Sequence, residues 1–318
     1  MRKGYNVKGV LRKRLRTLQR SAIERGLDGV LLKQYDYICN FSDEDENKKS
    51  NKKLIAVIVS AFIILVLSVS YVNSILSARC LLPSNYLVWE ATRPLADCAY
   101  CENVTKPIIL WNVTRQEFAN YYAYTPGPII VKNAIRHWRA TKEFSFNMFK
   151  RLYEETAGSY ESLEEGCQFL NFKTDLFSLR EVFSMPEARV RNEEGQKPWY
   201  VGWGNCHPDI LAQVRQYYDI PQFLPDDAEF PATENIFFGF EIGAVMHLDY
   251  ISRLMWQGQV QGNKTWFVAP VPECDHVCHK FHYYVEPGDV VLLDTRIWYH
   301  ATTIPKGQFS LTVQSEYG

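Results

Sequence analysis

Residues 234–251 read ENIFFGFEIGAVMHLDYI, and this stretch decides the fold of the larger part of the chain. The apolar run Ile236–Phe240 is typical of a buried strand, and the triplet His247-Leu248-Asp249 follows it. In a strand, residues i and i+2 face the same side. An imidazole and a carboxylate at this spacing would therefore face one metal ion from the same strand.

Short strand-like runs separated by turn signals continue on both sides of this stretch. We expect strands at Gly127–Lys132, Leu254–Val260, Lys264–Val268, Asp289–Leu293, Arg296–His300 and Phe309–Val313. We expect short helices at Phe144–Tyr153 and His207–Tyr218, and a loop at Glu187–Lys197. Many short strands between turns favour a β-barrel or jelly roll. The sequence therefore predicts a mainly β fold with flanking helices, in the α+β class.

A third candidate ligand, His300, ends the strand-like run that begins at Arg296. Two histidines and one carboxylate on one face of an octahedral ion leave three positions open, as in the facial triad of non-haem Fe(II) oxygenases. The pair His247 and Asp249 alone is a weak signal, and the alternative is that all three are ordinary polar residues of strands. Tryptophans 256, 266 and 298 are either walls of a pocket or, as we expect, ordinary core residues.

Several motifs together resemble the JmjC-type cupin dioxygenases, which use Fe(II) and 2-oxoglutarate, and in particular the small hydroxylase branch that includes the asparaginyl hydroxylase of the hypoxia pathway. The motifs are Gly127-Pro128-Ile129-Ile130-Val131 with Trp138 after it, His247-x-Asp249, Gly262-Asn263-Lys264, Pro287-Gly288-Asp289-Val290 and Trp298-Tyr299-His300. The resemblance covers about residues 127–318 and implies a double-stranded β-helix, also called a jelly-roll or cupin fold.

The resemblance implies that His247, Asp249 and His300 bind Fe(II) and are catalytic. It implies that Lys264 pairs with the distal carboxylate of 2-oxoglutarate and that Gln314 lies near this co-substrate, with ascorbate as the reductant. The implied reaction is hydroxylation of a side chain in a protein or peptide substrate. N-methyl demethylation is an alternative outcome of the same chemistry.

One position departs from the family pattern. Ala244, three residues before the first metal histidine, stands where the family often has a threonine that bonds the co-substrate. This departure favours a second alternative, a non-catalytic binding domain built on the same fold.

Residues 54–77 contain no charged side chain and read LIAVIVSAFIILVLSVSYVNSILS. As a helix they would span roughly 36 Å, enough to cross a hydrocarbon layer of ~30 Å. The alternatives are a buried core helix and a cleaved signal peptide. Lys48, Lys49, Lys52 and Lys53 flank one side and Arg79 the other, so the positive-inside rule places the N-terminus in the cytoplasm. The sequence predicts a type II single-pass protein whose main body lies in the ER or Golgi lumen or outside the cell.

This segment divides the chain into a basic cytoplasmic tail (1–53), a transmembrane helix that serves as signal-anchor (54–77), a stem (78–126) and a dioxygenase-like domain (127–318). In the tail, Leu11, Leu15, Leu18 and Ala22 fall at helical spacing. This pattern is typical of a helix on an anionic membrane surface, and a solvated tail is the alternative. The formal net charge of the whole chain is −1, which argues against a nucleic-acid partner held by a general basic field.

Cysteines and glycosylation signals agree with a lumenal body. Sequons begin at Asn103, Asn112 and Asn263, after the apolar segment. Seven cysteines lie in the same part of the chain, where disulfides persist; they are Cys80, Cys98, Cys101, Cys167, Cys206, Cys274 and Cys278. Because seven is odd, we expect Cys80 to be free for a bridge between chains in a homodimer. For Cys274 and Cys278 with the nearby histidines we expect a disulfide, with a solvated loop or zinc as alternatives, and for Cys98-x-x-Cys101 a structural rather than a redox role.

Overall fold

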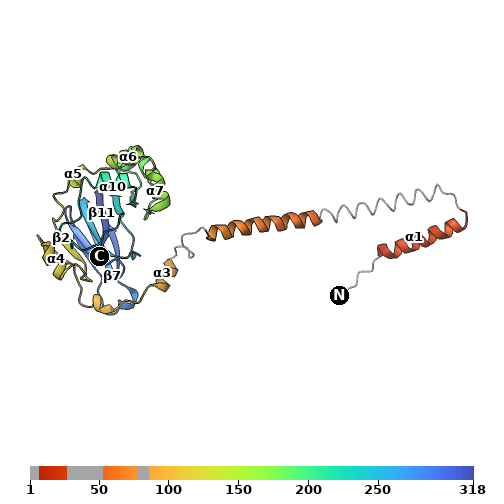
Figure 1. The fold of residues 1–318 in the computed structure, drawn as a ribbon, viewed down its shortest axis with the longest axis horizontal. Helices are drawn as coiled ribbons and strands as arrows, with labels where there is room; N and C mark the ends of the chain where they lie inside the picture. Colours follow the sequence, from red (N-terminus) through yellow and green to blue (C-terminus); the bar gives the residue numbers. More distant parts are fainter. Residues whose placement is uncertain (1–6, 27–52, 77–85) are drawn as a thin grey trace. The chain divides into compact units, whose positions relative to one another are not determined.

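The computed structural model describes residues 7–26, 53–76 and 86–318 (Figure 1). Residues Pro94–Gly318 form one compact unit, and the described residues before Pro94 belong to another.

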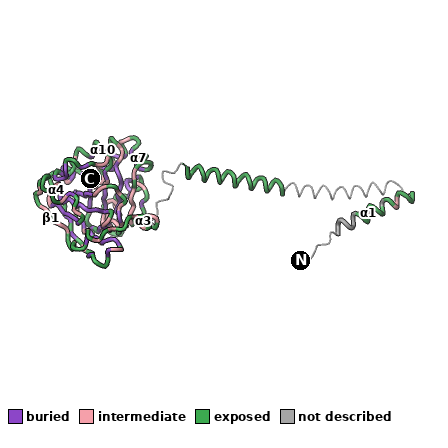
Figure 2. The backbone as a smooth tube through the Cα atoms, turned by 60° about the horizontal axis from the view of Figure 1, so that its bottom comes forward, coloured by how far each residue is buried: buried purple, intermediate pink, exposed green. Residues whose placement is uncertain are grey.

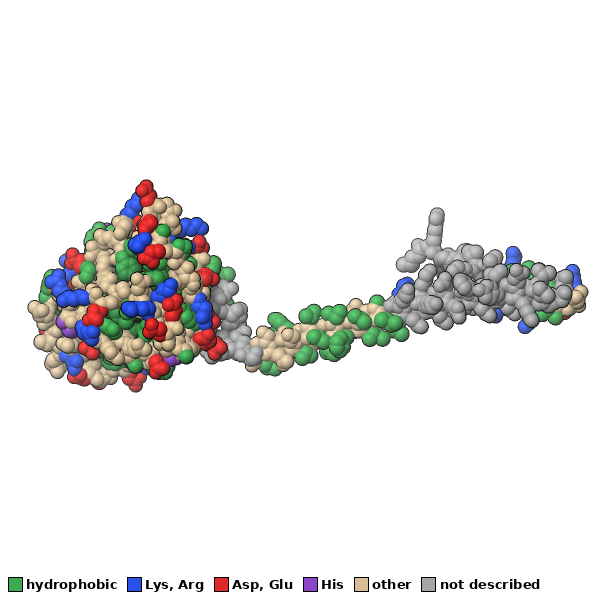
Figure 3. All heavy atoms as spheres, turned by 90° about the horizontal axis from the view of Figure 1, so that it is seen from above, with side chains coloured by type: hydrophobic (Ala, Val, Ile, Leu, Met, Phe, Trp, Pro, Cys, Tyr) green, Lys and Arg blue, Asp and Glu red, His purple; other side chains and the backbone are tan. Residues whose placement is uncertain are grey.

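The unit before Pro94 is helical. It comprises α1 (Val7–Glu24), the apolar helix Lys53–Leu76 and α3 (Tyr86–Thr92). The helix predicted around Leu11–Ala22 is confirmed as α1. The helix Lys53–Leu76 is long and apolar enough to cross a membrane, and none of its most apolar window is buried (Figure 2). Figure 3 shows hydrophobic side chains along it, in contrast to the mixed charges on the visible face of the compact unit.

The compact unit is built on two β-sheets. The major sheet has eight strands in the order β1-β2-β9-β6-β11-β5-β4-β3, and the minor sheet has three in the order β10-β7-β8. Only β1 and β2 pair in parallel; the other pairs are antiparallel. The strands are β1 (Ile108–Trp111), β2 (Ile129–Lys132), β3 (Phe169–Leu170), β4 (Tyr200–Asn205), β5 (Glu234–Phe240), β6 (Leu254–Gln261), β7 (Lys264–Pro270), β8 (Phe281–Val285), β9 (Val290–Leu293), β10 (Trp298–Thr303) and β11 (Phe309–Tyr317).

The two sheets face each other across a shared core, because one cluster of buried residues draws on both. Met255 and Leu293 of the major sheet lie in the same cluster as Trp266, Val268 and Trp298 of the minor sheet. The chain changes sheet after β6, β8, β9 and β10. This arrangement of two facing sheets is of the jelly-roll kind, and the predicted mainly β fold with flanking helices is confirmed.

Helices cover the other face of the major sheet, and their apolar sides share its larger core cluster (Figure 1). Phe149 of α6 lies 5.7 Å from Trp203 of β4, centroid to centroid, and 6.1 Å from Phe238 of β5. The helices are α4 (Arg115–Tyr121), α5 (Ala140–Glu143), α6 (Phe146–Glu155), α7 (Ser159–Gly166), α8 (Leu179–Phe183), α9 (Glu187–Val190) and α10 (Pro208–Val214), with 3₁₀ turns at Cys98–Tyr100 and Pro272–Cys274.

The sequence-based expectations differ from the structure in three places. Strands β1, β3, β4 and β8 were not predicted, and the expected loop Glu187–Lys197 begins with the one-turn helix α9. The segment assigned to a stem does not stand apart: β1 pairs with β2, and residues from Pro94 onward belong to the compact unit. We predict a stem over residues 78–126 because this segment shows little periodicity. Strand β1 within it is stabilised by pairing with β2, a contact that local periodicity does not reveal.

Three disulfides hold the compact unit, joining Cys98 to Cys274, Cys101 to Cys278 and Cys167 to Cys206. The disulfide expected for the Cys274–Cys278 cluster is confirmed, and neither sulfur is available as a zinc ligand. The two cysteines of the C-x-x-C pair do not bond each other. Cys80 lies outside the described residues, so a bridge between chains through it stays a prediction.

Candidate metal centre

The candidate site lies in a cavity of about 110 Å³ between the two sheets. Strands β4, β5, β6 and β11 of the major sheet and β7 and β10 of the minor sheet contribute to its lining. All five residues assigned from the sequence to the metal or the co-substrate line this one cavity; they are His247, Asp249, Lys264, His300 and Gln314.

Two histidines and one aspartate meet at one end of the cavity. His247 Nε2 lies 3.3 Å from Asp249 Oδ1, and His300 Nε2 lies 3.7 Å from Asp249 Oδ2. The two imidazole centroids are 4.2 Å apart. One candidate ligand atom from each of the three residues lies within 4.8 Å of the others. These distances suit three ligands around a single ion.

The backbone that presents these ligands differs from the expected strand. His247 forms a single β-bridge with His300, and Asp249 is anchored outside any strand by its amide, which donates to Thr295 O at 2.9 Å. The expectation that His247 and Asp249 share the face of a regular strand is therefore wrong. They converge because backbone contacts hold His247 against β10 and Asp249 against the loop before β10.

Backbone carbonyls fix the orientation of both imidazoles. His247 Nδ1 lies 2.6 Å from Val245 O, and His300 Nδ1 lies 3.2 Å from Trp298 O. A carbonyl oxygen only accepts, so each Nδ1 carries a hydrogen, and Nε2 is the ring nitrogen that would present its lone pair to an ion. This is the arrangement that orients a metal-bound histidine from its far side. Both Nε2 atoms face Asp249.

Burial and mutual charge set the protonation of the three groups. Burial, together with the nearby His247, lowers the pKa of His300 to about 4. Burial opposes ionisation of Asp249, but the two neighbouring histidines outweigh it and lower the pKa of this carboxyl. Burial also opposes protonation of His247, but the hydrogen bond with Asp249 and the charge of this carboxylate raise the pKa of the imidazole, so binding of an ion would release a proton from it. A neutral imidazole and an ionised carboxylate are the forms that bind a metal ion.

Lys264 lies on the inner wall of the same cavity with 1% of its surface exposed. Its Nζ donates to the Tyr200 hydroxyl at 2.7 Å and to Thr312 Oγ1 at 3.2 Å. It also donates to Gln257 Oε1 at 3.2 Å. Burial lowers its pKa to about 7, because among the described residues no carboxylate compensates its charge. Tyr200, Thr312 and Gln257 are site residues that sequence reasoning missed.

The hydroxyl of Thr302 lies beside Ala244, although residue 244 itself carries none. The Ala244 amide donates to Thr302 Oγ1 at 2.9 Å, and the buried Thr302 also lines the cavity. Thr302 lies two residues after His300 in β10, on the same inward face. A threonine hydroxyl is therefore present in the cavity, supplied by β10.

Only one of the three tryptophans forms a wall of the cavity. Trp266 lines it, and its ring lies 5.7 Å from that of His300 at an interplanar angle of 22°. Trp256 contacts Trp138 in the helical side of the core, and Trp298 donates from its indole nitrogen to Pro126 O at 2.7 Å. The core interpretation thus holds for Trp256 and Trp298.

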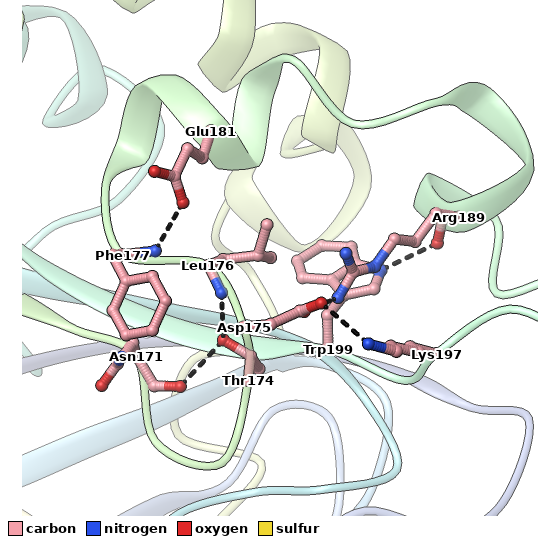
Figure 4. A network of polar contacts seen from close by, with 9 residues as sticks. All are labelled: Asn171, Thr174, Asp175, Leu176, Phe177, Glu181, Arg189, Lys197 and Trp199. Carbon is pink, nitrogen blue, oxygen red and sulfur yellow. Dashed lines mark hydrogen bonds and ion pairs between the residues drawn. The ribbon is translucent and has the colours of Figure 1, made fainter.

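A polar network beside the cavity braces the segment that follows β3 (Figure 4). Asp175 accepts hydrogen bonds from Arg189 and from Lys197, the latter at 3.2 Å, and Arg189 lowers the pKa of this carboxyl to about 2. The same segment places Phe172 in the cavity wall, with its ring 5.2 Å from that of Tyr200. The network connects this segment to α9 and to the residues before β4.

Comparisons with known proteins found no matching family model and no matching curated protein. Among solved structures, the chain is similar to the ribosomal oxygenase YcfD of Escherichia coli. Two structures of it give identities of 14% and 12%, coverages of 65% and 67% of this chain, and TM-scores of 0.42 and 0.40. A third, described as E. coli ycfD, gives 13% identity, 65% coverage and a TM-score of 0.39. The chain spans 52–53% of the length of these structures. At this level of likeness, what the site can do rests on its own geometry.

Proposed function

We propose that this chain is a membrane-tethered oxygenase that depends on Fe(II) and 2-oxoglutarate and hydroxylates a protein side chain in the secretory lumen or at the cell surface. The observation that carries the proposal is the pairing of two features in one cavity. His247, Asp249 and His300 converge at one end. The buried Lys264, for which no described carboxylate is a counter-ion, lies in the same cavity.

The three residues fit a ferrous ion. Two imidazole nitrogens and one carboxylate oxygen are the donor set of the facial triad, which leaves coordination positions open for other molecules. When bound, iron would supply the oxidising chemistry by which O2 gives one oxygen atom to 2-oxoglutarate, leaving succinate and CO2, and the other to a substrate C–H bond. The chain's own contribution is to hold both Nε2 lone pairs and the Asp249 carboxylate toward one point, with each imidazole oriented by a backbone carbonyl.

The surroundings of Lys264 fit the distal carboxylate of 2-oxoglutarate. A buried ammonium is costly unless an anion compensates it. The hydroxyls of Tyr200 and Thr312, which already accept from Lys264, can turn their own hydrogens toward a carboxylate. Lys264 would thus fix the far end of the co-substrate while its other end faces the metal.

The cavity is accessible from the side of His247. The His247 side chain is 33% exposed, whereas that of His300 is 6% exposed. Leu170, Phe172 and Ile251 contribute apolar groups to the cavity lining. A substrate side chain therefore approaches past His247, and the apolar wall helps to exclude water from the reacting atoms.

The apolar helix and the disulfides support the proposed location. The helix Lys53–Leu76 is long and apolar enough to cross a membrane, and three disulfides hold the unit that follows. Asn103, Asn112 and Asn263 are exposed and therefore open to glycosylation. A mobility shift of the full chain after glycosidase treatment, absent when the three asparagines are changed to glutamine, supports a lumenal body. If glycosidase treatment leaves the mobility of the cell-expressed chain unchanged, the lumenal location is contradicted.

The activity is tested with the full chain in detergent micelles. Given Fe(II), ascorbate, 2-oxoglutarate, O2 and its protein substrate, it should form succinate. Mass spectrometry of secretory proteins from cells with and without this chain should show a +16 Da product. Full turnover by His247→Ala would refute the proposal. The competing binding-domain function, which Ala244 favours, predicts neither metal nor 2-oxoglutarate binding.

A further inference from the structure

Helix α1 has an apolar face that no described residue covers. Leu15, Leu18 and Ala22 lie three and four residues apart, a spacing that places them on one face of a helix. Leu18 is 65% exposed, and no residue of α1 belongs to a hydrophobic cluster among the described residues. Because helices gain most of their stability from the packing of such a face, α1 calls for a partner beyond the described part of the chain.

The opposite face of α1 is basic. Lys13, Arg16 and Arg20 repeat the same spacing two positions earlier, which turns them by about 200° around the helix axis. All three side chains are exposed. The 18 residues of α1 contain six basic side chains against one acidic one, Glu24. A basic face opposite an apolar face is typical of helices that lie in the plane of an anionic membrane surface.

The apolar helix Lys53–Leu76 would keep α1 at a membrane. Residues 27–52 separate the two helices and can extend over at most roughly 90 Å. This tether gives α1 a high effective concentration at the surface, so that a weak affinity for lipid is sufficient. The cytoplasmic leaflet, where the N-terminus is proposed to lie, carries a negative surface potential from its anionic lipids. That charge is complementary to the basic face of α1.

A soluble protein with an acidic, apolar-lined groove is the competing partner, because basic amphipathic helices also bind in such grooves. Membrane lipid is favoured for two reasons. The tether places lipid next to α1 in every copy of the chain, whereas a soluble partner has to diffuse to it. The apolar face is also narrow and ends in Ala22, which offers little side chain to fill a groove.

We propose that α1 lies on the anionic cytoplasmic leaflet, with Leu15, Leu18 and Ala22 directed toward the acyl chains and the basic side chains reaching the headgroups. Long lysine and arginine side chains can do this because their apolar stems lie along the helix surface while the charge stays in water. The inference rests on the membrane crossing in the proposed function and is independent of the oxygenase activity.

The test uses the full chain reconstituted into vesicles of phosphatidylcholine with about 30% phosphatidylserine, an anionic lipid of this leaflet. Cys39→Ser and Cys80→Ser remove the two cysteines that the three described disulfides do not use. A nitroxide label is attached at Leu18→Cys on the apolar face, or at Thr17→Cys, the exposed neighbour that lies about 100° away around the helix. Collisions of the label are measured with O2, which is concentrated in lipid, and with a water-soluble nickel chelate. The ratio of the two should be at least fivefold higher at position 18 than at position 17.

The lipid charge and the helix charge are then removed in turn. In vesicles of phosphatidylcholine alone, the ratio at position 18 should fall at least threefold. Lys13→Gln with Arg16→Gln and Arg20→Gln should cause the same fall in the anionic vesicles, since glutamine keeps the helix propensity and removes the charge. A matched control removes the same charge from the compact unit and should leave the ratio unchanged; its changes, at three exposed lysines, are Lys142→Gln, Lys173→Gln and Lys306→Gln.

Two results would overturn the inference. Equal ratios at positions 17 and 18 in the anionic vesicles would show a solvated helix. A high ratio at position 18 that depends neither on phosphatidylserine nor on the basic face would show that the negative charge of the lipid plays no part.

Failure of this inference is distinguishable from failure of the proposed function. Both leaflets of the vesicles have the same composition, so the label reports lipid contact in either orientation of the chain, and the glycosidase experiment tests the orientation separately. A lipid-buried position 18 without succinate formation would refute the oxygenase and leave the inference standing. Succinate formation with equal ratios at the two positions would do the reverse.

Discussion

The backbones of His247 and His300 donate to each other: each amide lies 3.0 Å from the carbonyl of the other residue. The bridge brings their imidazoles to a centroid distance of 4.2 Å although the residues are far apart in the chain. The ligand pair is thus positioned by main-chain bonds, before any ion contributes. Whatever holds this bridge in register also holds the candidate metal centre.

Gly243, four residues before His247, is one such support. Its φ is +75°, and a Cβ there would lie 2.2 Å from Thr302 O in β10. Gly243→Ala should therefore displace the segment that carries His247, and we expect a loss of metal affinity of at least tenfold with a drop in melting temperature. Gly307 has the same φ of +75° and no atom within 4 Å of the added Cβ. Gly307→Ala should cost only the left-handed strain of about 1–2 kcal/mol and leave metal affinity unchanged. Equal metal affinities in the two variants would contradict this role of Gly243.

A pH-dependent stability follows from Lys264. Its pKa is about 7 in the fold against 10.5 ordinarily, so between these values the unfolded chain binds more protons than the folded one. Stability of the ligand-free protein should then rise with pH from about 7 toward 10, by up to about 1.4 kcal/mol per unit. Thermal melts of wild-type and Lys264→Met chains should diverge in this window. A difference between them that does not change with pH would show that Lys264 is not buried as described.

The same titration should affect co-substrate binding. Above pH 7 the ligand-free Lys264 loses the charge that would attract a carboxylate, so 2-oxoglutarate binding should weaken as pH rises from 6 to 9. Lys264→Met should bind 2-oxoglutarate at least tenfold more weakly at pH 6.5 and lose the pH dependence. Lys150→Met, on α6 and outside the cavity lining, is the matched control. Calorimetric titration with 2-oxoglutarate in the presence of Mn(II) measures the affinity and its pH dependence. Unchanged binding by Lys264→Met would remove Lys264 from this role.

The fold could be read from the sequence where strands carry their own apolar runs. Strands β5, β6, β7 and β11 lie at or near the predicted residues because their apolar side chains follow the pattern of a buried strand. Strand β4 was missed because its sequence, YVGWGN, carries two glycines and no alternation. Its strand conformation depends on pairing with β5, which a local pattern does not reveal. Tyr200 was missed for the same reason.

The ligand set could be proposed from residue types and spacing, but its geometry could not. That His247 and His300 would share a bridge, and that Asp249 would be anchored to Thr295, are long-range contacts. The Lys264 surroundings depend on Thr312 and Gln257, which come from different strands. The pairing of Cys98 with Cys274 and of Cys101 with Cys278 likewise depends on tertiary contacts.

The disulfides Cys98–Cys274 and Cys101–Cys278 join the same two segments, so removing one should destabilise the fold less than removing both. Each closes a loop of sequence separation 176 or 177 residues. With one bond intact, the other closes only a short additional loop. Cys98→Ser with Cys274→Ser should therefore lower the free energy of unfolding by about 2–3 kcal/mol, and removal of both bonds should lower it by roughly twice that or more. Thermal unfolding of the two variants measures the difference, with the number of bonds checked by mass spectrometry without reductant. Equal destabilisation by one and by both removals would contradict the double attachment.

The most direct test of the account is the stoichiometry of Fe(II) binding to the full chain under anaerobic conditions. The geometry predicts one ion per chain, lost or weakened at least a hundredfold in Asp249→Ala and in His300→Ala, and retained in His276→Ala, which removes an exposed histidine outside the cavity. Binding of one ion per chain that is equally tight in all four proteins would show that the ion lies elsewhere, and it would contradict the central claim.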